Sequence, residues 1–156
     1  MAEDNKNLFN KKITHGSDNP YYVETKKQLD SVGKGFCLAK WTQVTLQLQT
    51  GHNHSCHHPR THKINLKEIE RNPSALHNTQ YKKIRRKEML DGKRPAECDY
   101  CWNVEDNSDR FSDRVFKSGE TWSKPHFDEI KNSDWRANIN PRYVEVAFSN
   151  ACNFKC

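Results

Sequence analysis

Four cysteines restrict the folds open to this chain more than any other feature. Cys37 and Cys56 are separated by thirteen residues, then Gly51, then four more residues, and Cys98-x2-Cys101 follows much later. If the four thiols share one centre, the chain must bring distant segments together. Gly51 would let a strand end bend sharply, so that Cys56 returns towards Cys37. The spacing therefore predicts a site in which four thiolates ligate one metal ion or cluster.

The cysteine count also bears on the cellular compartment. The N-terminus is acidic and polar rather than a basic-then-apolar signal, and no apolar run approaches the roughly 20 residues that span a bilayer. The chain therefore reads as cytoplasmic, without a membrane partner. In a reducing compartment the six cysteines are expected to be ligands rather than disulfides. With only 33% hydrophobic residues, the core would gain from a metal or cluster that staples it.

Hydrophobic patterning predicts an α+β fold. Alternation at Val44, Leu46 and Leu48 indicates a half-buried strand that ends at Thr50-Gly51. A histidine-rich loop follows, with His52, His54, His57, His58 and His62 expected at the surface or beside the ligands. A second strand is predicted over 142–148, where Val144, Val146 and Phe148 share one face.

Turn and capping signals place the helices between these strands. Asn72-Pro73 opens a helical stretch, Asn78-Thr79 restarts it, and Gly92 is the expected stop. Further helices are predicted over 102–117 and 125–131, and a short one near 23–29. The four tryptophans are assigned to the core or to partial burial.

Composition divides the chain into four parts. Residues 1–34 are a polar leader that is expected to be partly disordered, and residues 35–119 form the module that carries the first four cysteines. A linker covers 120–140, and a last segment, 141–156, holds the second strand and Cys152 and Cys156.

More than one chemistry suits the first four cysteines. A thioredoxin-like redox pair at Cys98-x2-Cys101 needs a βαβ context, and none precedes it. Cys37 and Cys56, taken singly, could be small buried hydrophobes. Structural zinc would accept four cysteines, or three with His57 or His58, and spacing alone does not separate zinc from an iron–sulfur cluster.

The C-terminal pair stands on a loop that leaves the predicted strand. Cys152-x3-Cys156 is two thirds of a C-x3-C-x2-C motif, and the small Ala151 and the aromatic Phe154 accompany it. The pair resembles the signature of the radical SAM enzymes. The third cysteine would fall three residues beyond Cys156, so we expect the sequence to be a piece cut within its motif. The plain alternative is an incidental pair near a terminus.

The sequence upstream of this pair resembles the SPASM and twitch modules that carry auxiliary clusters in many radical SAM enzymes. The likeness covers about 37–105 and rests on the cysteine spacing and on three short stretches, Asn72-Pro73-Ser74-Ala75-Leu76, Met89-Leu90-Asp91-Gly92-Lys93 and Pro95-x2-Cys98. In the familiar members the module follows the barrel, whereas here it precedes the segment with the SAM motif. The order is therefore either permuted, or the upstream cysteines serve another purpose.

The resemblance implies a function for each cysteine group. Cys152 and Cys156 would hold two irons of a 4Fe-4S cluster that binds and reductively cleaves S-adenosylmethionine, at the start of a partial (β/α) barrel. Cys37, Cys56, Cys98 and Cys101 would fully coordinate an auxiliary 4Fe-4S cluster. A reductant such as flavodoxin or ferredoxin would supply electrons, and the substrate would be a peptide or a small molecule. Because only two of the three cysteine ligands of the SAM-binding cluster are present, this sequence alone should not be a competent catalyst.

The net charge of +6 supports a rival interpretation. Much of the positive charge lies in 82–87 and 93–94, which suits a face that binds nucleic acid. Glu88 and Asp91 dilute the run, and this favours an ordinary solvated helix surface. The alternative function is thus a non-enzymatic zinc module that binds nucleic acid through this helix.

Overall fold

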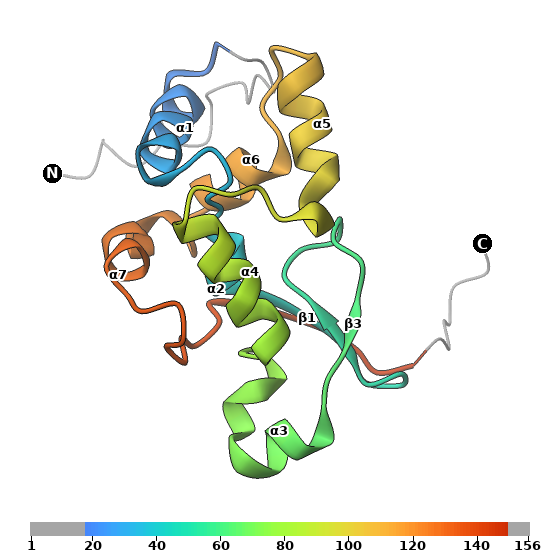
Figure 1. Cartoon of the computed structure of the whole chain (residues 1–156). Helices are drawn as coiled ribbons and strands as arrows, with labels where there is room; N and C mark the ends of the chain where they lie inside the picture. The colour runs from blue at the N-terminus through green and yellow to red at the C-terminus, as the bar shows by residue number, and fades with distance from the viewer. Residues whose placement is uncertain (1–17, 150–156) are drawn as a thin grey trace, which may run out of the picture.

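A computed structural model describes residues 18–149 and shows an α+β fold, as the patterning predicts. A small four-stranded sheet has the strand order β3-β2-β1-β4. Figure 1 shows α1, α5 and α6 at one end of the molecule and α3 at the other. The elements are α1 (Pro20–Val32), α2 (Ala39–Thr42), β1 (Gln43–Gln47), β2 (His52–His54), β3 (His62–Lys63), α3 (Leu66–Arg71), η1 (Pro73–Leu76), α4 (Gln80–Leu90), η2 (Ala96–Cys98), α5 (Asp99–Asn107), α6 (Asp113–Gly119), η3 (Lys124–His126), α7 (Phe127–Lys131) and β4 (Tyr143–Ala147).

Both predicted strands are present, and they are neighbours. β1 pairs in parallel with β4, with Val44 opposite Val144 and Leu46 opposite Val146. β1 also forms an antiparallel hairpin with β2, so part of the predicted histidine loop is strand. Gly51 has φ 68° in the turn between β1 and β2, a conformation that glycine adopts without strain. The bend expected at Gly51 is confirmed.

The capping signals locate η1 and α4 correctly. Thr79 caps α4 by accepting a hydrogen bond from the backbone N–H of Lys82, and Asn72 caps η1 in the same way. Gly92, directly after the last turn of α4, has φ 75°, as expected of a stop signal.

The leader is more structured than predicted, and the helix predicted over 125–131 is present as η3 and α7. Residues 20–32 form one 13-residue helix, α1, which starts at an Asn19 cap and buries Leu29 in the core. In the predicted linker, η3 and α7 place Ile130 in the same core. The part of the leader before residue 18 lies outside the described residues.

The helix predicted over 102–117 is two helices. α5 ends at Asn107, and α6 begins at Asp113 after Ser112 in its N-cap position. The break lets α6 return across the molecule, where it contacts α1. The prediction was wrong because the apolar residues on both sides of the break kept a helical spacing.

The core lies where these helices meet the hairpin. Its buried members are Leu29, Phe36, Leu38, Trp41, Met89, Cys98, Cys101, Trp102 and Ile130. Trp41 and Trp102 are buried and Trp122 and Trp135 are half-buried, so the expectation for the tryptophans is confirmed. Two of the four predicted ligands, Cys98 and Cys101, are therefore part of the hydrophobic core itself.

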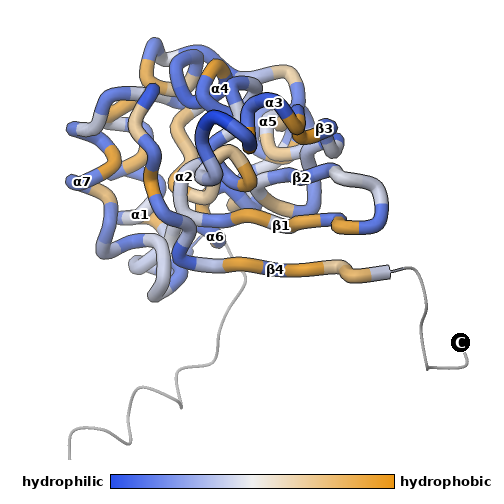
Figure 2. Tube along the Cα trace, turned by 90° about the horizontal axis from the view of Figure 1, so that it is seen from below, coloured by the Kyte–Doolittle hydropathy of each residue, from blue (hydrophilic) through white to orange (hydrophobic). Residues whose placement is uncertain are grey.

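β4 forms an exposed edge of the sheet. Figure 2 shows its apolar stretch running alongside β1. Val144 is 51% exposed and Phe148 is 75% exposed, so the apolar face that these residues share is largely open.

Candidate functional site

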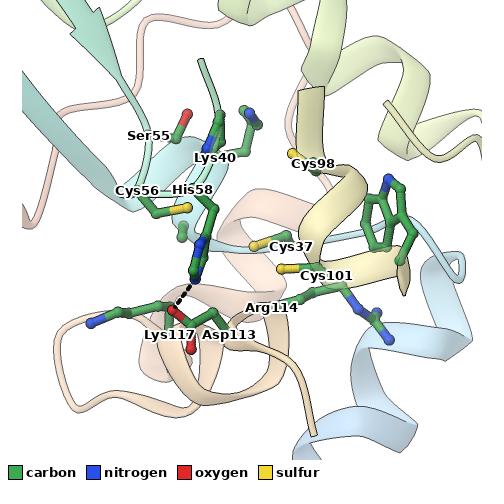
Figure 3. A pocket seen from close by; sticks show the side chains of 13 residues that line it. Cys37, Lys40, Ser55, Cys56, His58, Cys98, Cys101, Asp113, Arg114 and Lys117 are labelled. Atoms are coloured by element: carbon green, nitrogen blue, oxygen red, sulfur yellow. Dashed lines mark hydrogen bonds and ion pairs between the residues drawn. The ribbon is translucent and has the colours of Figure 1, made fainter. Parts of the chain in front are cut away.

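All four upstream cysteines line one pocket between the hairpin and the helices. Cys37 lies just before α2, Cys56 follows β2, Cys98 ends η2, and Cys101 lies in the first turn of α5. In Figure 3 the sulfur of Cys56 points into the pocket from one side, and those of Cys37, Cys98 and Cys101 from the other. The fold thus brings together the residues that the spacing singled out.

The sulfur atoms are spaced more widely than one zinc ion requires. A tetrahedral zinc site with Zn–S bonds of about 2.3 Å sets its sulfurs about 3.8 Å apart. Among residues 18–149, the ligand atoms that gather within 4.8 Å of one another belong to His57, His58 and Asp113, and no three of the four sulfurs form such a group. An iron–sulfur core, which places several atoms between its thiolates, suits this wider spacing better than a single ion.

Hydrogen-bond donors and a positive charge lie next to the sulfurs. Such groups stabilise a thiolate and help to set the potential of an iron–sulfur cluster. The Ser118 hydroxyl donates to Cys37 Sγ over 3.9 Å. The backbone N–H groups of Ala39, His58 and Arg114 favour the thiolate forms of Cys37, Cys56 and Cys101, and the charge of Lys40 favours that of Cys98.

Burial makes these thiols poor acids as long as nothing ligates them. It raises the pKa of Cys56 and of Cys101 to about 12, that of Cys98 to about 11, and that of Cys37 above its usual value. At neutral pH the unligated cysteines are therefore protonated. Only a metal ion or cluster would hold four thiolates here, and its binding would release protons.

A buried ion pair, Lys40–Glu97, adjoins the thiols. The Lys40 ammonium donates to the Glu97 carboxylate, and the two side chains are 2% and 7% exposed. Burial alone would lower the pKa of Lys40, but the neighbouring Cys98 and Glu97 raise it above its usual value. Burial alone would raise the pKa of Glu97, and the charge and hydrogen bond of Lys40 lower it instead. The pair is thus fully ionised at neutral pH.

Arg114 holds the opposite wall of the pocket. Its guanidinium donates two bonds of 2.8 Å to Glu105, one of 2.9 Å to Asp30, and one of 3.1 Å to the Phe36 carbonyl. The side chain is 1% exposed. Because its own backbone N–H reaches Cys101, Arg114 joins α6 to α5, α1 and the segment before Cys37.

Two histidines meet a carboxylate at the rim. His57 Nε2 and His58 Nε2 lie 3.2 and 2.8 Å from Asp113 Oδ2. The ring of His58 stacks on Tyr100 with a centroid separation of 3.7 Å. These imidazoles associate with Asp113 rather than with three thiols, which disfavours a zinc site made of three cysteines and a histidine. The three groups are of a kind that could hold a divalent cation.

The basic run over 82–87 is divided between the core and the surface. Lys82 and Arg86 are 1% and 0% exposed, whereas Lys87 is exposed and Lys83 and Arg85 are half-buried. Lys82 Nζ donates to the Gln43 carbonyl and lies 3.0 Å from His77 Nδ1, and Arg86 donates to the Lys40 carbonyl. These bonds end on carbonyls at or just after α2, where the helix dipole favours cations.

Sequence reasoning missed Lys40, Glu97 and Arg114. Lys40 follows Cys37 by three residues and Glu97 directly precedes Cys98. Charged residues this close to proposed ligands were a usable signal. Arg114 carried no such signal, because its partners are distant in the sequence.

Cys152 and Cys156 lie outside the described residues. Within residues 18–149, no helix combines the length and the apolar character that crossing a membrane requires. Comparison of the chain with protein-family models, with curated proteins and with solved structures found no match.

Proposed function

We propose that this chain binds a 4Fe-4S cluster through Cys37, Cys56, Cys98 and Cys101. One observation carries the proposal: four cysteines from three separate segments, two of them buried and two half-buried, line one pocket. The donor set is the one that 4Fe-4S clusters use. With four protein ligands, every iron would be coordinated, which suits electron transfer or structural support rather than chemistry at an open iron.

The setting that we propose is a cytoplasmic radical SAM protein. Besides the resemblance of the cysteine motifs, β4, which leads towards Cys152, pairs in parallel with β1, and parallel strands are the building units of (β/α) barrels. Cys152 and Cys156 would belong to a second cluster that cleaves S-adenosylmethionine. The auxiliary cluster would pass electrons or help to place a peptide or small-molecule substrate, with flavodoxin or ferredoxin as a candidate reductant.

Anaerobic reconstitution with iron and sulfide tests the cluster directly. The protein should become brown and bind about four irons at this site, as four thiolate ligands allow. Because Cys152 and Cys156 could hold further iron, the measurement uses the Cys152→Ala/Cys156→Ala variant as its background. In that background, Cys98→Ala should lose the broad visible absorbance and the bound iron. A colourless protein with stoichiometric zinc would refute the cluster and favour the rival module.

The radical SAM setting needs a separate measurement. The protein translated from the complete gene should convert S-adenosylmethionine to 5′-deoxyadenosine under dithionite, and Cys152→Ala should abolish this cleavage. Cleavage that is unchanged in Cys152→Ala would contradict the assignment of that cysteine, whatever the upstream site binds.

A further inference from the structure

The Lys40–Glu97 ion pair is the charged feature closest to the thiols. The Lys40 ammonium donates to the Glu97 carboxylate, and Lys40 and Cys98 line the same pocket. Tyr81 hydrogen-bonds to Glu97 from α4. Since both charged side chains are buried, solvent screens them weakly, and each acts on its surroundings more strongly than a surface charge would.

We propose that the Lys40–Glu97 ion pair sets the reduction potential of the cluster, with the two charges acting in opposite directions. The inference rests on the proposed function. The potential of an iron–sulfur cluster follows its net charge, the hydrogen bonds to its sulfurs and its exposure to solvent. Lys40 supplies a positive charge in the wall of the pocket that Cys98 lines.

The sign follows from electrostatics. Reduction adds one electron, so the reduced cluster is the more negative form. A positive ammonium in the pocket wall that Cys98 also lines stabilises that form and raises the potential. The Glu97 carboxylate repels the added charge and lowers the potential. Because Lys40 lines the pocket, whereas Glu97 lies behind it and is bound to the ammonium, the effect of Lys40 should be the larger.

A purely mechanical role makes a different prediction. Lys40 lies three residues after Cys37, and Glu97 directly precedes Cys98, so the pair also joins two ligand segments. If it served only as a clasp, removing either charge would weaken cluster retention. The potential of the retained cluster would then stay the same.

The experiment is a redox titration of the reconstituted full chain, followed by EPR. All variants carry Cys152→Ala and Cys156→Ala, so that one cluster is observed. Lys40→Met should shift the midpoint to more negative potential, by at least a tenfold change in the oxidised-to-reduced ratio, or about 59 mV for one electron. Glu97→Gln should shift it in the positive direction. Lys40→Arg, which keeps the charge, should stay closer to the parent.

Lys82→Met is the matched control, because Lys82 is also buried but does not line the pocket, and its Nζ donates to the Gln43 carbonyl. It should shift the midpoint less than Lys40→Met does. Should Lys40→Met fail to retain its cluster, Glu97→Gln still tests the sign, because the loss of the carboxylate charge should shift the midpoint in the positive direction.

Unchanged midpoints, or shifts of the same sign in Lys40→Met and Glu97→Gln, would overturn the inference while leaving the cluster in place. A parent protein that binds no iron would overturn the proposed function, and the inference with it.

Discussion

Gly35 provides a demanding test of the site geometry, because two backbone segments cross there. A Cβ atom on Gly35 would lie 2.0 Å from the Lys93 carbonyl oxygen and 2.7 Å from its carbon. Ordinary van der Waals contact begins at 3.4 Å. The obstructing atoms are backbone, so no rotamer change relieves the clash. Gly35→Ala must therefore push the two segments apart.

The displacement would reach the ligands. Gly35 is two residues before Cys37, and Lys93 is five residues before Cys98. Overpacking a tight site costs about 1–3 kcal/mol, and we expect the upper end here. For a chain of this size, about 3 kcal/mol corresponds to a loss of roughly 6–12 °C in Tm. The separation of Cys37 from Cys98 should also lower the bound iron.

The assay combines thermal unfolding, followed by circular dichroism, with iron content after anaerobic reconstitution. Gly51→Ala is the matched control, because nothing lies within 4 Å of the added carbon and the residue has φ +68°. It should lose about 1–2 kcal/mol from its left-handed backbone alone and keep its iron. If Gly35→Ala retains both the Tm and the iron of the parent, the crossing described here is wrong.

Three further predictions concern stability. Arg114→Met should lower the free energy of unfolding in urea by about 3–5 kcal/mol, because it leaves the buried Glu105 without its partner. Adding Glu105→Leu should restore part of this loss. Equal stabilities of both variants and the parent would contradict the prediction. Met89 is fully buried, so Met89→Ala should lower the free energy of unfolding by about 2–5 kcal/mol, and Met89→Leu should lower it by less than about 1.5 kcal/mol. Similar urea midpoints for the two variants would count against this packing. Burial holds the pKa of His62 at about 4 rather than 6.5, so the unfolded chain binds more protons between these values and stability should fall as pH drops through that range. His62→Gln should make this fall shallower, and an unchanged slope would refute the assignment.

Local signals in the sequence were sufficient for several elements. Thr79 and Gly92 bound α4 because a side-chain cap and a left-handed glycine act within a few residues. β1 was predictable because alternation reports a half-buried strand without knowledge of its partners. The grouping of Cys37 with Cys98 was predictable for another reason, since four thiols at such spacing suit the ligation of one metal ion or cluster.

The buried cations show where such reasoning fails. Lys82 and Arg86 are four residues apart and so lie on one face of α4, yet charge was taken as a mark of exposure. Their partners are backbone carbonyls, such as those of Lys40 and Gln43, which every residue possesses and no sequence motif reveals. Tertiary structure decided the burial of this face. The expectation of exposure was therefore wrong for these two residues.

The contacts around the pocket also change the role expected of a cluster in this fold. Composition suggested that a metal centre would staple a weak core. Yet the Cys37 and Cys98 segments are already held together by the Lys40–Glu97 ion pair and by the crossing of Gly35 with Lys93. Arg114 adds a third link through its bond to the Phe36 carbonyl.

Cys56 is placed differently. It follows β2 on a loop, and its sulfur faces the other three from across the pocket. The half of the site that holds Cys37, Cys98 and Cys101 is thus organised by ion pairs, backbone contact and the hydrophobic core. Of the four proposed ligands, Cys56 would therefore depend most on a bound cluster for its position. Loss of the cluster should accordingly loosen the loop around Cys56 before it disturbs the helices.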